Sequence, residues 1–405
     1  MNNVFNKELA AILDEKIDLL FPKLIEIRRE LHMNPELSSQ EFETTKRING
    51  WLKEFGIAQI PANLITGTAG EVTGKGQGPT IALRADIDAL PIQEASTLPF
   101  RSKIDGVSHM CGHDVHTTIT LGAGIILQEL SDRLPGNVRL LFQPAEETEG
   151  GAVSMIEQGL LEGVQSIIGL HNSPDIPTGT MGIKEGSFMA SCDDFILTIK
   201  GKGGHAALPE NTIDPIMIGS AVVSQLQTIV SRTVSAKESA VVSIGSFQAG
   251  ATNNVIPDKA ILKGTVRTSN EEVRQKIYQV FKKMVTNTVT GFGGEVEIDY
   301  QFLIPAVVND ARITEIVRSA AVSIVGEENT ILSDSTMGGD DFSYYQKEVP
   351  GCYVWLGSGN EEKGIIHGLH HPEFMVDEEA IKIGIKWMVQ SAFHLLQEHR
   401  DLTKN

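Results

Sequence analysis

The sequence predicts an α/β fold: a mostly parallel sheet with helices on both faces, plus an inserted ferredoxin-like α+β domain. Buried-strand and helix patterns alternate at the start of the chain and again at its end, which is typical of a parallel sheet covered by helices. Between these parts the order changes to β-α-β-β-α-β, the split βαβ order. We therefore predict one domain from residues 1–186 and 303–405, and an inserted domain from residues 187–302.

The first fifty-odd residues are expected to be helical. Ser38 and Glu41 match the capping-box pattern S-x-x-E, in which the two side chains satisfy free amides at a helix start. Apolar residues then recur at helical spacing, and Gly56 is expected to end the helix. These apolar residues are Phe42, Ile48, Trp51, Leu52 and Phe55.

Strands and helices then alternate as short apolar runs and longer segments with an apolar face. In the first part of the chain the expected strands are 80–85, 138–143 and 166–170, and the expected helices are 115–130 and 150–160. In the inserted domain the expected strands are 195–201, 240–247, 260–268 and 294–302, and the expected helices are 213–231 and 270–290. The last part continues with helix 309–325, strand 353–357 and a helix near 377–400.

The charge balance excludes some classes of partner. The 405 residues contain 52 acidic and 34 basic side chains, for a net charge of −18. Binding nucleic acid or an anionic membrane surface needs a basic face, so we expect neither partner. No run of about 18 apolar residues is present, so we expect no transmembrane helix.

The cysteines and the N-terminal residues predict a cytoplasmic protein. Three cysteines in a chain of this length do not make a disulfide framework, which favours a reducing compartment. Charged residues interrupt any apolar core in the first twenty positions, which excludes a signal peptide. These are Lys7, Glu8, Asp14, Glu15 and Lys16.

Acids, imidazoles and a thiol collect just beyond the carboxyl ends of the predicted strands, where open α/β sheets bind ligands. The contributing residues are Asp86, Asp88, Cys111, His113, Asp114, Glu146, Glu147 and His171. The histidines cluster as His109, His113 and His116 and as His367, His370 and His371. Cys, His and Glu are ligand types of a catalytic zinc-like site. A structural zinc module would need paired C-x-x-C units, which the sequence lacks.

Each of these residues also has a structural interpretation. Cys111 could be a small side chain buried in the apolar core, and His171 could be a core histidine with satisfied hydrogen bonds. The aspartates at 86 and 88 could cap a turn. The glutamates at 146 and 147 could begin a helix, where negative charge is favourable.

Eight motifs carry a family resemblance. They are LRADIDALP (83–91), MCGHDVHT (110–117), FQPAEE (142–147), GLH (169–171), GGHAALP (203–209), NVIP (254–257), GGDDF (338–342) and HHPEF (370–374). Together they resemble the aminoacylase and carboxypeptidase metallohydrolases. They are most similar to the amidohydrolase branch with hippurate hydrolase, auxin-conjugate hydrolases and N-acyl amino-acid deacylases. The match runs from about Arg28 to Phe374, and MCGHD followed by FQPAEE is its most specific part.

The resemblance implies an activity and a cofactor. It implies hydrolysis of the amide bond of N-acyl L-amino acids, with an acetyl, benzoyl or similar acyl group, at a centre of two divalent metal ions. Zinc or manganese is expected, with nickel and cobalt as further options. The implied metal ligands are Cys111, in the bridging position, His113, Glu147, His171 and His371.

The resemblance also implies roles for the remaining site residues. Glu146 matches the general base and acid. His205 matches a histidine of a lid domain that reaches the active site of a partner subunit, so a homodimer through the inserted domain is expected. Asn254 and Arg267 match positions that hold the substrate carboxylate.

The sequence departs from part of the wider family at one point. Many members carry a His-x-Asp strand motif and a bridging aspartate, whereas this chain has Asp86 and Asp88 on the strand and Cys111 at the bridge. Asp86 is therefore not assigned as a ligand. Asp88 is expected to orient a ligand from behind.

Three other functions compete with the deacylase. A dipeptidase or carboxypeptidase could use the same scaffold, although CGHDxH together with FQPAEE favours the deacylase branch. A non-catalytic metal-binding protein would lack the base, but Glu146 is present. A nucleotide-binding protein would need a phosphate loop at a strand–helix turn, and the glycine-rich 74–78 segment is followed by neither a lysine-serine pair nor a helix.

Overall fold

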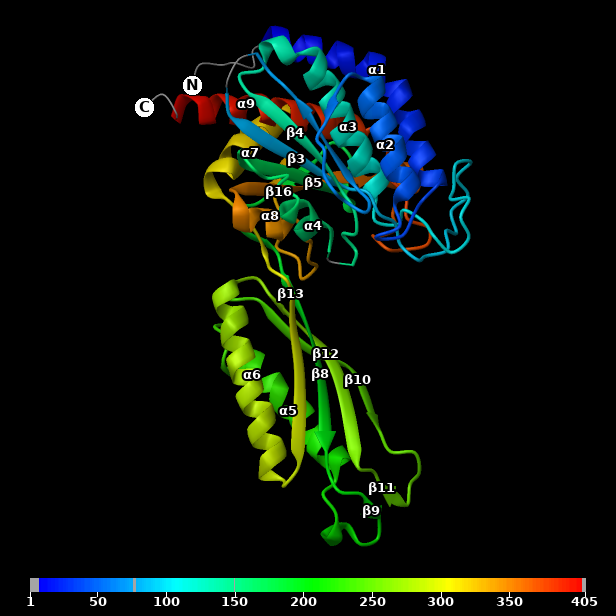
Figure 1. The fold of residues 1–405 in the computed structure, drawn as a ribbon, viewed down its shortest axis with the longest axis vertical. Coiled ribbons are helices and arrows are strands. Elements are labelled where there is room, and N and C mark those ends of the chain that lie inside the picture. The colour runs from blue at the N-terminus through cyan, green and yellow to red at the C-terminus, as the bar shows by residue number, and fades with distance from the viewer. Residues whose placement is uncertain (1–6, 76–77, 149, 403–405) are drawn as a thin grey trace. The chain divides into compact units, whose positions relative to one another are not determined.

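The computed structural model describes residues 7–75, 78–148 and 150–402, which form two compact units (Figure 1). The second unit contains Ser187–Val307 and Ser335–Ser343, and the rest belongs to the first. The first crossing falls between residues 186 and 187, where the sequence placed it. The return crossing lies about five residues later than expected. Residues 335–343 also belong to the second unit. The sequence does not reveal this, because the segment is short, polar and contains glycine.

The first unit is built on an eight-stranded sheet in the order β1-β2-β4-β3-β5-β16-β6-β15. Its centre is parallel, because β3 pairs in parallel with β4 and β5, and β5 pairs in parallel with β16. Antiparallel pairs lie toward both edges. The strands are β1 Ala58–Gln59, β2 Thr68–Val72, β3 Thr80–Asp86, β4 Asn137–Gln143, β5 Val164–Pro177, β6 Met181–Ile183, β15 Thr330–Leu332 and β16 Gly351–Gly359.

Helices cover both faces of this sheet, as the α/β prediction requires (Figure 1). α1, α3, α7 and α9 pack on one another and on one face. α4 and α8 contact each other through Met155 and Tyr345 and lie on the opposite side of the strands. The helices are α1 Lys7–Met33, α2 Phe42–Glu54, α3 His113–Glu129, α4 Gly151–Glu157, α7 Ala311–Val325, α8 Phe342–Glu348 and α9 Ala380–Leu402.

The predicted capping box at α2 is wrong. α2 begins at Phe42 and Glu41 is its N-cap, but the Glu41 side chain does not cap the helix. The Glu36 carboxylate accepts from the amides of Glu43 and Thr44 in the first turn. The Ser38 hydroxyl instead donates to Asp88, and the Glu41 carboxylate accepts from the Thr66 hydroxyl and the Ala145 amide. Both residues have longer-range partners, which a local sequence pattern cannot show.

The second unit has the predicted β-α-β-β-α-β order. Its sheet runs β10-β12-β8-β13, and every neighbouring pair is antiparallel. α5 and α6 pack on this sheet around a core of their own. The elements are β8 Ser191–Lys200, β9 Gly204–His205, α5 Pro215–Arg232, β10 Ala240–Ala249, β11 Val255–Ile256, β12 Lys259–Thr268, α6 Glu271–Gly291 and β13 Glu295–Ile304. The chain crosses between the units within or beside β7 Gly186–Met189 and β14 Val307–Asn309.

None of the described helices combines the length and the apolarity that a bilayer crossing needs.

Candidate metal centre and active site

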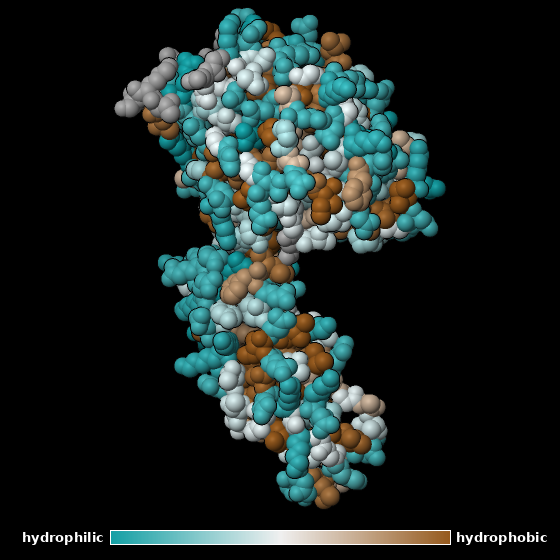
Figure 2. All heavy atoms as spheres, viewed as in Figure 1, coloured by the Kyte–Doolittle hydropathy of each residue, from teal (hydrophilic) through white to brown (hydrophobic). Residues whose placement is uncertain are grey.

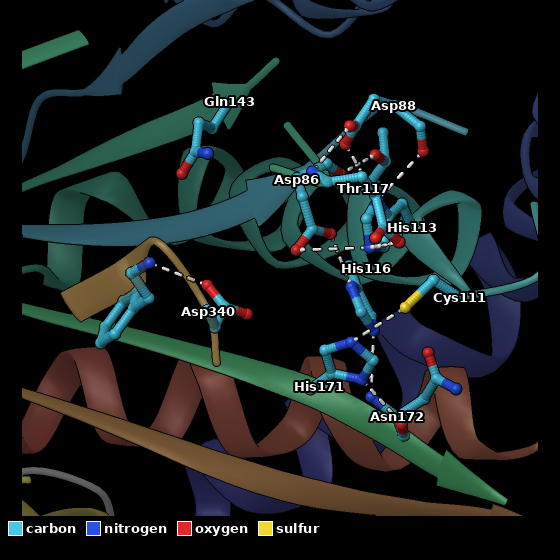
Figure 3. Close-up of polar contacts among 12 residues, drawn as sticks. Asp86, Asp88, Cys111, His113, His116, Thr117, Gln143, His171, Asn172 and Asp340 are labelled. Carbon is cyan, nitrogen blue, oxygen red and sulfur yellow. Dashed lines mark hydrogen bonds and ion pairs between the residues drawn. The ribbon is translucent and has the colours of Figure 1, made fainter. Parts of the chain in front are cut away.

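The candidate centre lies in the first unit, where β3 and β4 end and α3 begins (Figure 3). The start of α3 supplies His113, and the preceding loop supplies Cys111. Gly112 joins them with φ +90°, a left-handed conformation that glycine adopts without strain. A Cβ at Gly112 would lie 1.9 Å from the Asn172 Oδ1 atom. The turn that brings thiol and imidazole together therefore needs glycine.

Asp88 holds two candidate ligands from behind. The His113 Nδ1 atom lies 3.1 Å from the Asp88 Oδ1 atom and 3.0 Å from the Asp88 carbonyl oxygen. The other carboxylate oxygen accepts from the Glu147 amide at 3.1 Å and from the Ser38 hydroxyl at 2.6 Å. With Nδ1 donating to Asp88, the His113 Nε2 atom carries the lone pair that can bind a metal ion. Asp88 thus lies where the expected orienting role needs it.

Cys111 and His171 approach each other directly. The Cys111 Sγ atom is 3.4 Å from the His171 Nε2 atom. The His171 Nδ1 atom donates to the Asn172 carbonyl at 2.8 Å, which leaves Nε2 as the nitrogen that faces the thiol (Figure 3). His171 lies within β5 rather than after it, because this strand continues to Pro177.

Glu146 and Glu147 follow β4 on a constrained backbone. Ala145 has φ +50°, and its amide donates to the buried Glu41 carboxylate at 2.8 Å. Such a conformation is costly for a non-glycine residue and persists where the surroundings fix it. One ligand atom from each of Glu146, Glu147 and His113 lies within 4.8 Å of the other two. The turn therefore brings both carboxylates to the imidazole.

The structure brings His370, not His371, to this centre. The His370 Nε2 atom lies 3.3 Å from the Glu147 Oε1 atom, and ligand atoms of His370, Glu147 and Cys111 form one group within 4.8 Å. His370 has φ +64°, and its amide donates to the Met110 carbonyl, which fixes it beside the Cys111 loop.

His371 is turned to other partners. Its ring stacks on His367, with centroids 4.2 Å apart and planes 6° from parallel, and its Nδ1 atom accepts from the Glu373 amide. A metal ion lies in the plane of an imidazole that binds it, so two stacked rings cannot share one ion in this arrangement. The structure therefore places His370, rather than the expected His371, beside the other candidate donors.

The donor atoms fit a metal centre. The His113 Nε2 and Glu147 Oε1 atoms are buried without a hydrogen-bond partner among the described residues, although buried polar atoms are normally satisfied. Ligands about 2.0–2.3 Å from a tetrahedral ion lie roughly 3.3–3.8 Å apart. The distances above, and 3.9 Å between the His113 Nε2 and Glu147 Oε1 atoms, are close to this range. A cation would give these two atoms a partner.

The electrostatics of the cluster also favour a cation. Burial raises the pKa of Cys111 well above its ordinary value, and the charges of Glu147, Glu146 and Asp86 raise it further. Burial alone would lower the pKa of His113, but the neighbouring carboxylates outweigh burial and raise it to about 10. Several carboxylates are thus gathered around the buried Cys111 side chain. A divalent cation would offset their negative charge and favour the thiolate form of Cys111 over the thiol.

Asp86 belongs to a separate buried network behind the centre. Its carboxylate is 2.6 Å from the Arg84 guanidinium and 2.6 Å from the His116 Nδ1 atom, while His113 Nε2 is 3.9 Å away. The His116 Nε2 atom accepts from the Asn172 amide. Burial would raise the pKa of Asp86, but His113, His116 and Arg84 hold it well below its ordinary value. Sequence reasoning assigned no role to Arg84, His116 or Asn172. The available signal was their position, because Arg84 and His116 lie inside two of the motifs and Asn172 directly follows a third.

The remaining expected residues lie in the second unit. His205 and Asn254 come together, because β9 pairs with β11 and the Ala206 amide donates to the Asn254 carbonyl. Arg267 lies near the far end of β12, paired with Cys192. β12 begins at Lys259, and Arg267 is eight positions later. At about 3.3 Å per residue, Arg267 therefore lies roughly 26 Å along the strand from Lys259. A shared carboxylate site of Asn254 and Arg267 is therefore not formed within one second unit.

Comparison with known proteins agrees with this geometry. The model of peptidase family M20/M25/M40 matches residues 82–394. The chain belongs to this family. It is 45% identical over 377 residues to an N-acetylcysteine deacetylase of Bacillus subtilis, covering 93% of this chain and 97% of the relative. It is 38% identical over 365 residues to thermostable carboxypeptidase 2 of Saccharolobus solfataricus, covering 89% and 92%.

A solved structure also matches this chain over nearly its whole length. The Bacillus subtilis YXEP protein, described as a dinuclear metal binding peptidase, superposes with a TM-score of 0.84 at 41% identity, covering 94% of this chain and 99% of that one. The predicted family and α/β fold are confirmed, and the chain is a hydrolase of this family.

Proposed function

We propose that this chain hydrolyses the amide bond of N-acyl L-amino acids and releases a carboxylic acid and a free amino acid, with two divalent metal ions as cofactors. The observation that carries the proposal is the buried group of Cys111, His113 and His171 beside Glu146 and Glu147. The deacetylase relative supports the substrate class, and the dinuclear relative supports the two ions.

The proposed residue roles follow from the geometry. Cys111, His113, Glu147, His171 and His370 would hold the two ions. When bound, the ions supply charge that polarises the amide carbonyl and acidifies the attacking water. Asp88 fixes the His113 tautomer and the Glu147 backbone. The thiol, imidazole and carboxylate donors favour zinc or manganese, with nickel and cobalt as further options.

Glu146 is the proposed general base and acid. Its neighbour Glu147 has its amide fixed by Asp88 and its carboxylate 3.3 Å from His370, so the two adjacent carboxylates are proposed to divide into one metal ligand and one base. Glu146 takes a proton from the water as oxygen bonds to the amide carbon. It then gives that proton to the nitrogen as the carbon–nitrogen bond breaks. The second proton of the water stays on the carboxylic acid and passes to the amine at neutral pH, so the products are a carboxylate and an ammonium group and every proton is accounted for.

Replacing the base tests this mechanism. Glu146→Gln keeps the shape of the side chain but cannot accept the proton, so we expect turnover to fall about 10²–10⁴-fold. Both metal equivalents should remain in elemental analysis, because Glu146 is not among the proposed ligands. Turnover of N-acetyl amino acids within a few-fold of wild type would contradict the assignment of the base.

The second unit is proposed to act as a lid and dimerisation domain. Its surface carries apolar areas (Figure 2), and β10 is an edge strand that a second copy could extend. Exposed apolar side chains of this unit include Leu208, Ile216, Met217, Phe247 and Val255. His205 would donate to the developing oxyanion of the partner subunit, and Asn254 and Arg267 would hold the substrate carboxylate from different subunits.

Subunit mixing tests the role of His205. His205→Ala and Glu146→Gln homodimers should each be weakly active, whereas mixed dimers should regain activity because one composite site has both residues. Light scattering would establish the dimer, and differently tagged subunits would establish exchange. No regain in confirmed mixed dimers would place His205 and Glu146 of one site on the same subunit.

A carboxypeptidase is the second candidate, because a thermostable carboxypeptidase is also 38% identical. A panel of acetyl-, benzoyl- and peptidyl-amino acids on the metal-loaded enzyme separates the two. Faster turnover of the peptidyl substrates would favour the carboxypeptidase. We also propose a reducing, cytoplasmic location, supported by three buried cysteines, all described, that form no disulfide.

A further inference from the structure

A second group of buried charges lies at the first turn of α3, facing away from the metal donors. Asp114 follows His113 in the chain, and one of its carboxylate oxygens is 2.9 Å from the Arg28 Nε atom and 2.8 Å from the His32 Nδ1 atom. The other ring nitrogen of His32 is 3.2 Å from the Glu94 carboxylate. Arg28 and His32 both come from α1. Two cationic and two anionic groups thus meet inside the first unit.

Burial makes this network expensive. Arg28, His32 and Asp114 are each about 1% exposed, and Glu94 is 7% exposed. Paired buried charges often stabilise a fold no better than apolar side chains of the same volume, so stability alone is a weak reason for the network. Burial and Arg28 lower the pKa of His32, but Asp114 and Glu94 outweigh them and raise it, which fits a protonated ring between two carboxylates.

The first turn of α3 needs such an anchor. Its N-cap, Gly112, has no side chain and makes no cap hydrogen bond. Without a cap, rotation of the first turn would move His113 relative to Asp88 and Glu147. The Asp114 carboxylate ties this turn to α1, and its negative charge suits a helix N-terminus. Asp114, the second residue of α3, is therefore fixed to α1. His113, the first residue, presents its imidazole to the metal donors on the other side of the helix.

We propose that Asp114, held by Arg28 and His32, is a positioning residue that sets the direction of His113 and so the affinity of the metal centre. This inference rests on the proposed metal-dependent function. Asp114 touches neither the metal donors assigned above nor the reacting atoms. It acts through the backbone of the first turn of α3.

Two substitutions of His32 separate positioning from general stability. An Asn amide nitrogen takes the place of the His Nδ1 atom, and a Gln amide nitrogen takes the place of Nε2. His32→Asn therefore keeps the donor toward Asp114, and His32→Gln keeps only the donor toward Glu94. Both remove the same charge and ring. Zinc affinity is measured on the full chain by competition with a chromophoric chelator, and thermal melting is measured alongside.

The expected result is a difference between the two variants in metal affinity. His32→Gln should bind zinc about ten-fold more weakly than wild type, and Asp114→Asn about 10–100-fold more weakly, the range for residues that orient ligands. His32→Asn should stay within a few-fold of wild type. With cobalt in place of zinc, the thiolate charge-transfer band should change in the first two variants and be unchanged in His32→Asn.

Asp193→Asn is the matched control, because Asp193 is an equally buried partner of Arg274 in the second unit. It should lower the melting temperature without changing zinc affinity. Equal affinities of the two His32 variants, whether both normal or both weak, would overturn the positioning role, and this comparison holds even where Asp114→Asn fails to fold. Wild-type protein that binds none of zinc, manganese, nickel and cobalt would overturn the proposed function as well.

Discussion

Adjacent residues of the same type can have unrelated roles in this site. His370 and His371 differ by one position, yet His370 faces Glu147 and Cys111, and His371 stacks on His367. The backbone of His370 decides this. Its φ of +64° turns the ring away from the direction that extended backbone would give, and the bond from its amide to Met110 holds that turn.

Exchanging these two histidines for alanine tests the ligand assignment. His370→Ala should lower the bound metal from two toward one equivalent per subunit, because it removes a donor beside Glu147. His371→Ala should keep both equivalents and serves as the matched control. Elemental analysis after gel filtration measures the difference, and the opposite order of metal loss would restore His371 as the ligand.

The same comparison shows how far sequence reasoning reaches at this scale. Cys111, His113, Glu147 and His171 were predicted from their motifs near the ends of the expected strands and from the family resemblance, and the structure brings their side chains close together. The choice between His370 and His371 depends on one dihedral angle in a loop, which no periodicity encodes. The sequence placed Asp114 at the same sheet edge but could not give its partners, because they lie on α1, about eighty residues earlier in the chain.

At the scale of elements, regular segments were predictable and their junctions were not. Most of the long strands and amphipathic helices were placed within a few residues, because apolar periodicity reports burial directly. Exceptions are β5, which continues to Pro177, and the short helix α8, which was not predicted. The short strands β1, β2, β6 and β15, which lie toward the two edges of the sheet, were missed, since two to five residues carry little pattern. The start of α3 was predicted two residues late, at 115, because its N-terminus is set by Gly112 and a close contact to Asn172 rather than by a capping side chain.

This junction allows a prediction about stability. Gly112→Ala should destabilise the first unit by about 2–5 kcal/mol, because left-handed backbone strain of about 1–2 kcal/mol adds to overpacking against buried Asn172. Gly106→Ala is the matched control, since Gly106 has φ +73° but open space around its Cβ position. Urea unfolding with chelator present removes any metal contribution. Equal losses in both variants would show that the contact with Asn172 yields easily.

At the scale of the whole molecule, the chain has two separate apolar cores. One core lies in the first unit around α1, α3 and α9, and the other lies between α5, α6 and the four-stranded sheet. The sequence revealed this division, because the order of strands and helices changes where the second unit begins. The candidate metal donors belong to the first unit alone. Metal binding should therefore stabilise one core without acting directly on the other.

Calorimetry of the full chain tests this division, since separate cores are expected to break simple two-state unfolding. A chelator should lower the melting temperature of one transition only, that of the first unit, because ligand binding stabilises only the unit that binds.

Leu226→Ala and Leu395→Ala remove the same side chain from positions 0% exposed in the second and first cores. Each should cost about 2–5 kcal/mol. Leu395→Ala should shift the transition that the chelator shifts, and Leu226→Ala the other one. A single transition that moves with all three changes would show that the two cores unfold together.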